Sequence, residues 1–228
     1  MFPRSCSSGG YLSAATRRDV DAQPGEPAAG QCVCSIFARL GPQVGGERKE
    51  RHVTRGAAKV AYVDQVLEHP GPFTFAVDEA GALLWVQFLD GDYAETAAEL
   101  LARRGFHLEA DAARTAAARR QLEGYCRGER RVFTLPLALR GTPWQQAVWQ
   151  AVAEIPFGET RTYGEVATGL GRPRAARAMG RANATNPLPI VVPCHRVVGT
   201  SGALTGYAGG LHIKQRLLKH EARVLAGG

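Results

Sequence analysis

The residues with the clearest capacity for chemistry are Cys194, His195 and Arg196, which are adjacent in the sequence. A thiol attacks as the thiolate, and a neighbouring base or cation lowers its pKa from about 8.5. The histidine and the arginine supply such groups, so the tripeptide is a candidate nucleophilic site. The alternative is a buried, inert cysteine beside a surface histidine and arginine, and the tripeptide alone does not exclude it.

An apolar run precedes the tripeptide and is expected to hold it. Residues 188–192 are Leu-Pro-Ile-Val-Val, and residues 197–199 are Val-Val-Gly. A short apolar run bounded by prolines and a glycine is typical of a buried strand. Adjacent side chains on a strand point to opposite faces, so a water between Cys194 and His195 would have to relay a proton.

Two capping boxes predict helices in the segment before the tripeptide. Residues 142–145 (Thr-Pro-Trp-Gln) and 162–165 (Thr-Tyr-Gly-Glu) each combine an N-cap threonine with a Gln or Glu three positions later. The second helix should end near Leu170, and a third is expected over residues 174–184. Two short helices joined by a tight turn that contains glycine are typical of a helix-turn-helix.

The first part of the chain has a different character. Residues 1–56 are rich in Gly, Ser, Ala, Arg and Pro, and we expect them to form a disordered tail. Alternating apolar residues between turn signals then predict a meander of three strands, followed by helical spacing. The expected strands cover residues 60–66, 73–77 and 82–88, and the expected helices 93–104 and 110–125. The fold class is therefore α/β (α+β), with a structural N-terminal α/β domain over residues 57–137 and a mainly helical domain over 138–228.

The net charge of +7 is concentrated in one part of the chain. Residues 138–228 contain eleven basic and four acidic residues, whereas the remainder contains 17 of each. All of the excess positive charge thus lies in the part with Cys194, which favours a polyanionic partner.

The cysteines and the hydropathy pattern indicate a soluble intracellular protein, in the cytoplasm or with the nucleoid or nucleus. The five cysteines are Cys6, Cys32, Cys34, Cys126 and Cys194. An odd, scattered set is not a disulfide framework. Cys32 and Cys34 lack a second Cys/His pair at ligand spacing, so we expect no metal site. No apolar run approaches the 18 or more residues of a membrane span, and residues 1–6 lack the apolar core expected of a signal peptide.

Several ordered motifs in the C-terminal part resemble those of one family. They are residues 141–145, 155–160 (Ile-Pro-Phe-Gly-Glu-Thr), 177–183 (Arg-Ala-Met-Gly-Arg-Ala-Asn), 186–198 (Asn-Pro-Leu-Pro-Ile-Val-Val-Pro-Cys-His-Arg-Val-Val) and 206–210 (Gly-Tyr-Ala-Gly-Gly), with Lys214, Leu217, Leu218 and Glu221. Together they resemble the O6-alkylguanine-DNA alkyltransferases, or methylated-DNA–protein-cysteine S-methyltransferases. The resemblance is strong over about residues 138–228 and weak over about 57–137.

The resemblance implies direct, single-turnover repair of DNA. The alkyl group on O6 of guanine, or on O4 of thymine, would move to Cys194 and remain there, inactivating the protein. In double-stranded DNA the alkyl carbon is shielded by stacking, so the base has to be flipped into a pocket. The implied partner is duplex DNA that contains alkylated guanine, bound by a monomer with a winged helix-turn-helix-like motif. No cofactor is expected, because neither a P-loop nor a glycine fingerprint occurs.

The resemblance also assigns roles to particular residues. Glu221 would orient His195, Tyr163 would donate to N3 of the departing guanine, and Asn186 would shape the backbone around Cys194. The substrate pocket would comprise Val197, Tyr207, Ala208 and Gly209, where Ala208 replaces the serine that the family often has. The DNA-binding residues would be Tyr163, Arg174, Ala175, Ala176, Arg177, Ala178, Gly180 and Arg181, with Arg177 taking the place of the flipped base in the stack.

Two other functions remain open at this point. A non-catalytic helix-turn-helix protein could bind DNA or its lesions without repairing them, although the presence of Cys194 argues against this reading. A cysteine hydrolase is a further alternative, although the cysteine and histidine of such enzymes are usually far apart in sequence.

Overall fold

The computed structural model describes residues 59–91, 93 and 96–227, which all belong to one compact unit. The expected tail over residues 1–56 lies outside the described residues, as do Cys6, Cys32 and Cys34. None of the described helices is both long and apolar enough to cross a membrane.

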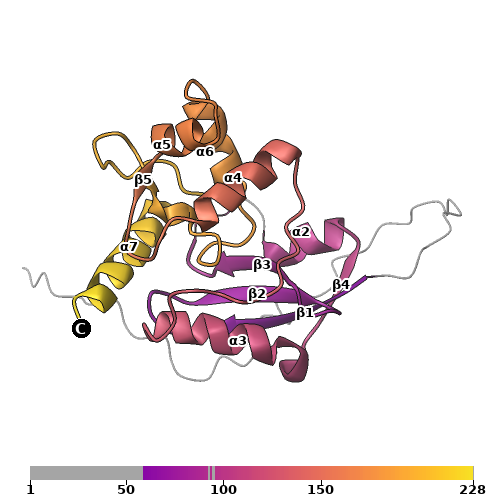
Figure 1. Cartoon of the computed structure of the whole chain (residues 1–228). Coiled ribbons are helices and arrows are strands. Elements are labelled where there is room, and N and C mark those ends of the chain that lie inside the picture. Colours follow the sequence, from indigo (N-terminus) through magenta and orange to yellow (C-terminus); the bar gives the residue numbers. More distant parts are fainter. Residues whose placement is uncertain (1–58, 92, 94–95, 228) are drawn as a thin grey trace, which may run out of the picture. The chain divides into compact units, whose positions relative to one another are not determined.

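A four-stranded sheet begins the described part of the chain (Figure 1). Its strands are β1 (Lys59–Val66), β2 (Phe73–Asp78), β3 (Leu83–Phe88) and β4 (Phe106–Glu109), in the order β3-β2-β1-β4. The first three pair antiparallel, which confirms the expected meander, whereas β4 pairs parallel with β1. The strand β4 was not expected, because the alternation of apolar and polar residues in Phe-His-Leu-Glu extends over only four positions.

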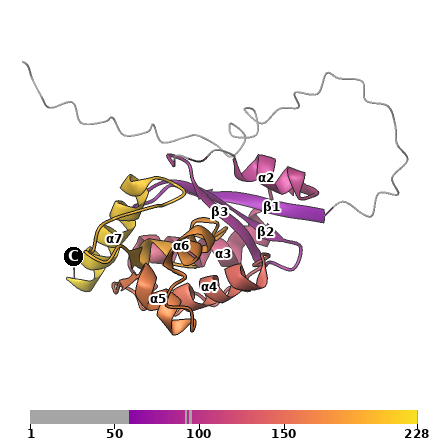
Figure 2. The same cartoon turned by 90° about the horizontal axis from the view of Figure 1, so that it is seen from above.

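Two helices pack on the sheet. They are α2 (Ala97–Arg103) and α3 (Ala112–Cys126), which confirm the two expected helices, although the first begins at Ala97 and leaves Tyr93 outside it. Thr96 and Glu99 form a capping box at the start of α2, and the Asp111 side chain accepts from two backbone N–H groups at the start of α3. Side chains alternate across the sheet, so Phe75 packs with α3 in one core cluster and Ala76 with α2 in another. Figure 2 shows the two helices on opposite sides of the strands.

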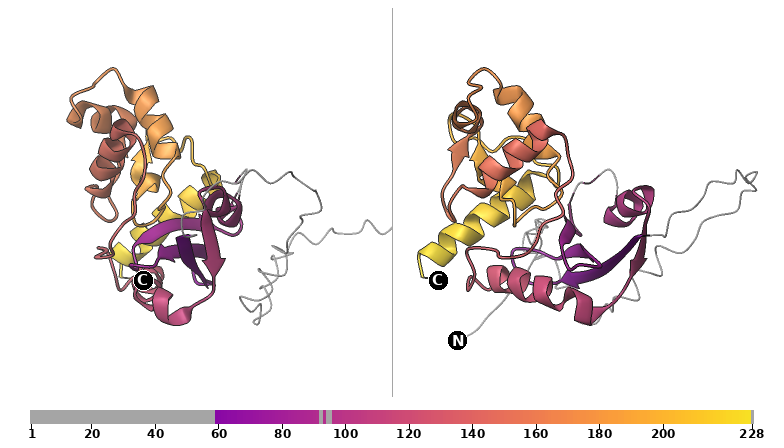
Figure 3. Two further views of the ribbon diagram at one scale, coloured as in Figure 1. Left: turned by 90° about the vertical axis from the view of Figure 1, so that its right-hand side faces the viewer. Right: turned by 45° about the vertical axis from the view of Figure 1, so that its right-hand side comes forward.

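The C-terminal part is mainly helical, as expected. Its elements are α4 (Pro143–Ala153), β5 (Arg161–Thr162), α5 (Tyr163–Gly169), α6 (Ala176–Ala184), η1 (Cys194–Arg196), β6 (Val197–Val198) and α7 (Leu211–Leu225). Both capping boxes are present, at Thr142 and Thr162, because the signals that form them are local. In Figure 3 these elements, coloured orange to yellow, gather beside the sheet.

The expected strand over residues 188–192 is wrong. This run consists of turns and bends, and the tripeptide after it forms the short 3₁₀ helix η1. Ile190 has a φ of 76°, which a strand does not allow. The backbone bonds are local instead, from Val192 N to Leu188 O at 2.8 Å and from Cys194 N to Val192 O at 2.8 Å. The expectation of burial was correct, since residues 187–198 are all buried.

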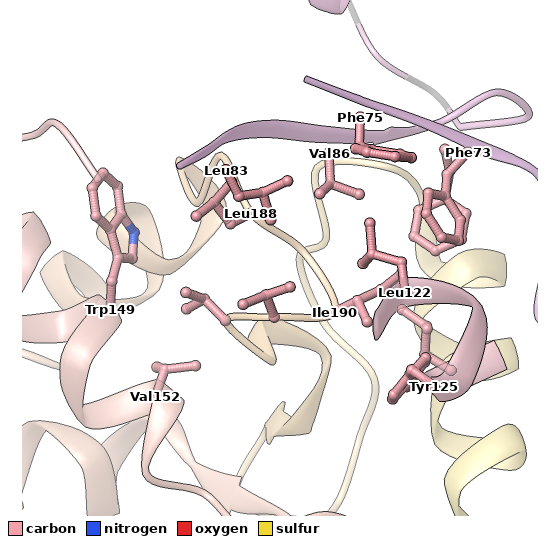
Figure 4. Close-up of a cluster of buried hydrophobic side chains, with 14 of the residues drawn as sticks. Phe73, Phe75, Leu83, Val86, Leu122, Tyr125, Trp149, Val152, Leu188 and Ile190 are labelled. Atoms are coloured by element: carbon pink, nitrogen blue, oxygen red, sulfur yellow. The ribbon is translucent and has the colours of Figure 1, made fainter. Parts of the chain in front are cut away.

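One hydrophobic core includes side chains from both parts of the chain (Figure 4). Phe73 and Phe75 of the sheet and Leu122 of α3 belong to the same cluster as Trp149 of α4 and Ile190. Backbone bonds also join the two parts, because Val86 N on the edge strand β3 donates to Pro187 O at 2.9 Å. The sheet therefore lies directly against the segment that carries the candidate nucleophile.

Candidate active site and nucleic-acid interface

Cys194 is held on a backbone that two asparagines fix. Asn186 Nδ2 donates to Val192 O at 2.8 Å, and Asn186 Oδ1 accepts from Leu188 N at 2.9 Å. Asn183 Nδ2, in the last turn of α6, donates to the Cys194 carbonyl at 3.3 Å. The thiol thus sits on a defined segment in which only 6% of the cysteine surface is exposed.

The surroundings of the thiol keep it protonated in the resting protein. Burial raises the pKa of Cys194, and the Asn186 and Tyr207 side chains and the Lys214 charge oppose this effect only in part. Activation therefore requires a base that can remove the thiol proton.

His195 has the features of such a base. Its Nε2 lies 2.8 Å from Oε1 of Glu221, and both side chains are fully buried. Burial lowers the pKa of His195 although Glu221 favours the charged form, so the ring is neutral near pH 7. With Nε2 donating to the carboxylate, Nδ1 carries the free lone pair, and this atom has no hydrogen-bond partner among the described residues.

Glu221 of α7 is bound by groups from several elements. Its Oε1 accepts from Arg196 Nη2 at 2.9 Å and from the Tyr125 hydroxyl at 3.0 Å, and its Oε2 accepts from Gly158 N at 2.8 Å. Burial alone would raise the pKa of this carboxyl, but the hydrogen bonds and charges of His195 and Arg196 lower it to about 2. The carboxylate is therefore charged at every pH at which the protein is expected to work.

A cavity of about 100 Å³ lies beside the thiol. Its lining includes Asn183, Asn186, Pro189, Cys194, Tyr207, Ala208 and Gly209 from the C-terminal part, and Trp85, Val86 and Tyr93 from the N-terminal part. A Cβ at Gly209 would come within 2.6 Å of the Tyr93 hydroxyl oxygen, so only glycine leaves the cavity open there. Val197, which was expected in the pocket, does not line this cavity, because it lies in β6 and is fully buried.

The sequence analysis did not identify Trp85 and Tyr93 as site residues. Neither belongs to a recognisable motif, and they reach the cavity because β3 bonds to the backbone at Pro187. Lys214 was noted only as a motif residue, yet it is a fully buried cation. Its Nζ donates to Val197 O at 2.6 Å and to Thr205 O at 2.9 Å, which joins β6 to the loop before Tyr207. Burial lowers the pKa of Lys214 to about 8.

Tyr163 lies at the first position of α5, close to the same loop. Its hydroxyl donates to Thr205 O at 3.0 Å, and Lys214 Nζ lies 5.7 Å from the centre of its ring. The ring packs over α6 where there is no side chain, since a Cβ at Gly180 would lie 3.4 Å from it. Tyr163 is half-buried.

Helix α6 presents a basic face made largely of small residues. Arg174, Arg177 and Arg181 are exposed, whereas Ala175, Ala176, Ala178 and Gly180 are half-buried. On the opposite face Met179 is buried, and Asn183 reaches the Cys194 carbonyl as described above. Small side chains between exposed arginines allow close approach to a nucleic-acid backbone, and the last turn of the same helix lines the cavity beside Cys194.

Several known proteins are similar to this chain. A family model described as the DNA-binding domain of 6-O-methylguanine DNA methyltransferase matches residues 143–223. A methylated-DNA–protein-cysteine methyltransferase of Methanosarcina acetivorans is 48% identical over 158 residues, which are 68% of this chain and 96% of that protein. A crystal structure of Mycobacterium tuberculosis OGT in complex with DNA is similar with a TM-score of 0.63 and 40% identity, over 72% of this chain and 94% of that one.

Proposed function

The chain belongs to the methylated-DNA–protein-cysteine methyltransferases, and on that premise we propose that it repairs DNA by moving an alkyl group from guanine O6 to Cys194. O4-alkylthymine is a second expected substrate. The observation that carries the proposal is the buried His195–Glu221 pair. The free Nδ1 belongs to His195, which follows Cys194 in the sequence, and Cys194 lines a cavity.

The transfer is a displacement at the alkyl carbon. His195 Nδ1 takes the thiol proton through a bridging water, and the Cys194 thiolate attacks the carbon. The new bond joins sulfur to carbon, the bond from carbon to O6 breaks, and its electron pair passes into the guanine ring. Glu221 keeps Nδ1 free by accepting from Nε2, and its charge stabilises the imidazolium that forms.

The departing guanine needs a proton or a strong hydrogen bond. Tyr163 supplies it when its hydroxyl exchanges the Thr205 carbonyl for N3 of the base. General acid assistance of this kind typically contributes about 100- to 10,000-fold to a rate. At the cavity, Ala208 offers no hydroxyl, so its backbone N–H is the group that remains to bind O6.

Duplex DNA docks on α6. Its small residues approach the minor groove, whose hydrogen-bonding pattern is nearly the same for all sequences. Arg174 and Arg181 bind phosphates, while the planar guanidinium of Arg177 fills the stack that the flipped base has left. We expect residues 138–228 to carry these functions and the protein to act as a monomer.

The alkylated product is a stable thioether. A thiolate is a poor leaving group toward water, so the alkyl group stays on Cys194 and each molecule reacts once. The non-catalytic alternative is less well supported, because a protein that only binds lesions has no use for a buried thiol beside a histidine base.

Mass spectrometry tests the proposal directly. The protein is incubated with a duplex that contains O6-methylguanine, and its peptides are weighed. One methyl group per molecule is expected on Cys194, and none in a Cys194→Ser variant. Cys126 is the internal control, because burial raises its pKa to about 12 and leaves it inert. A methyl group on Cys126, or more than one turnover per molecule, would refute the proposal.

A further inference from the structure

Tyr125 connects the N-terminal part of the chain to the catalytic carboxylate. It lies in the last turn of α3, and its hydroxyl donates to Glu221 Oε1 at 3.0 Å. Both residues have no exposed surface. We propose that Tyr125 is a positioning residue for alkyl transfer, which sets the orientation of Glu221 and the basicity of His195. This inference rests on the function proposed above and gives the N-terminal part a role beyond support.

Tyr125 and His195 share one oxygen atom of Glu221. Glu221 Oε1 accepts from the tyrosine hydroxyl and also lies 2.8 Å from His195 Nε2. A carboxylate oxygen that accepts one more hydrogen bond has less negative charge available for its other partners. The Tyr125 hydroxyl therefore reduces the stabilisation that Glu221 gives to a charged His195, and it restricts where Oε1 can lie.

The tyrosine is a donor at every working pH. Burial, and the neighbouring Glu221 charge, raise the pKa of Tyr125 well above its usual value, so the phenol stays neutral. The other titratable groups that face this network are Arg196 of η1, Tyr207 before α7, Lys214 and His220 of α7, and Cys126 of α3. All of them remain when the hydroxyl is removed, so its effect can be measured separately.

The ring of Tyr125 is held independently of its hydroxyl. Its centre lies 5.9 Å from that of Phe133, 6.0 Å from Phe157 and 5.1 Å from His220. The Tyr125 carbonyl also lies 2.8 Å from His220 Nε2. A Tyr125→Phe variant keeps these contacts and loses only the bond to Glu221.

The test measures the reactivity of Cys194 without DNA. Wild type and Tyr125→Phe are treated with iodoacetamide over a range of pH, and modification of Cys194 is followed by peptide mass. The rate should fall at acid pH as His195 becomes protonated. In the variant the midpoint of this fall should move to higher pH by roughly 0.5 to 1 unit, because only part of the strength of a hydrogen bond to a carboxylate acts on the charge of His195.

Tyr62→Phe is a matched control, because it removes a tyrosine hydroxyl from the same N-terminal part of the chain. The ring centre of Tyr62 of β1 lies 5.3 Å from the guanidinium carbon of Arg114, and Tyr62 is not among the groups described above as bound to Glu221. Tyr62→Phe should leave the midpoint unchanged. Site-specific 3-fluorotyrosine at position 125 is a more acidic and stronger donor, so it should move the midpoint to lower pH in a protein with an intact core.

The outcomes separate a positioning role from a structural one. A structural role would scale the rate by the same factor at every pH and leave the midpoint unchanged, and this result would overturn the inference. The titration of the His195 ring, followed by NMR, gives the same comparison without any reaction. Because neither measurement involves DNA, its result does not depend on whether the proposed repair activity is found.

Discussion

Replacing Glu221 by glutamine should destabilise the fold strongly, because this carboxylate neutralises a buried arginine. Glutamine keeps the shape of the side chain, but its amide nitrogen cannot accept a hydrogen bond. Arg196 is only 5% exposed and would keep its charge without a carboxylate partner. Removing one partner of a buried ion pair typically costs about 3–5 kcal/mol.

The pKa of Glu221 gives a second value for the loss of stability expected in the variant. Folding lowers this pKa from 4.5 to about 2. At about 1.4 kcal/mol for each pH unit, the ionised carboxyl contributes about 3–4 kcal/mol to stability at neutral pH. For a protein of this size, such a loss corresponds to a fall in Tm of roughly 6–16 °C.

The pH dependence follows from the direction of the shift. Because the pKa of Glu221 is lower in the folded than in the unfolded state, its contribution is fully present above pH 4.5 and is lost as the pH falls to about 2. The difference in stability between wild type and Glu221→Gln should therefore be largest near pH 7 and should shrink below pH 4.5.

Urea unfolding of both proteins at several pH values measures this difference. Glu159→Gln is the control, because Glu159 pairs with Arg161 at 2.9 Å and both side chains are nearly half exposed. Pairs of this kind contribute about 0–1 kcal/mol. The reasoning would be wrong if Glu221→Gln stayed within about 1 kcal/mol of wild type at pH 7, or if the difference were as large at pH 3 as at pH 7.

Four further predictions concern repair itself. Arg177→Ala should slow single-turnover transfer about tenfold more than Lys219→Ala does. This factor corresponds to about 1.4 kcal/mol, the value of one lost stacking contact. Equal rates for the two variants would contradict the stacking role. Gly209→Ala should reduce transfer and leave DNA affinity unchanged, because its methyl group would meet the Tyr93 hydroxyl at 2.6 Å; an unchanged transfer rate would show that the base does not use this cavity. Affinities for unrelated duplexes of equal length should agree and should fall steeply between about 50 and 200 mM salt, whereas a strong preference for one sequence would contradict minor-groove docking. A truncated protein that begins at Ala57 should keep its transfer rate, and a folded but inactive one would show that the first residues have a role.

Local signals accounted for most of the helices. The capping boxes at Thr142 and Thr162 form within four residues, so their chemistry can be read without knowledge of the fold. The strand predicted over residues 188–192 is wrong, because apolar composition indicates burial but does not specify the backbone conformation. The left-handed conformation of Ile190 depends on how the surrounding segments pack, and no local signal indicates it.

The C-terminal motifs by themselves indicated the family and the candidate nucleophile and base that we propose. Cys194, His195 and Glu221 belong to those motifs, and the structure brings the last two within 2.8 Å of each other. The exposed arginines of α6 were also evident, because charge and small residues alternate along a short segment.

Only the tertiary structure decided what the N-terminal part does for the site. Trp85 and Tyr93 line the cavity and Tyr125 binds Glu221 across 96 residues of sequence. These contacts arise because the edge strand β3 and the end of α3 pack against the segment around Cys194. Contacts of this kind depend on the burial of apolar surface between distant segments, which is non-directional and leaves no spacing pattern in the sequence.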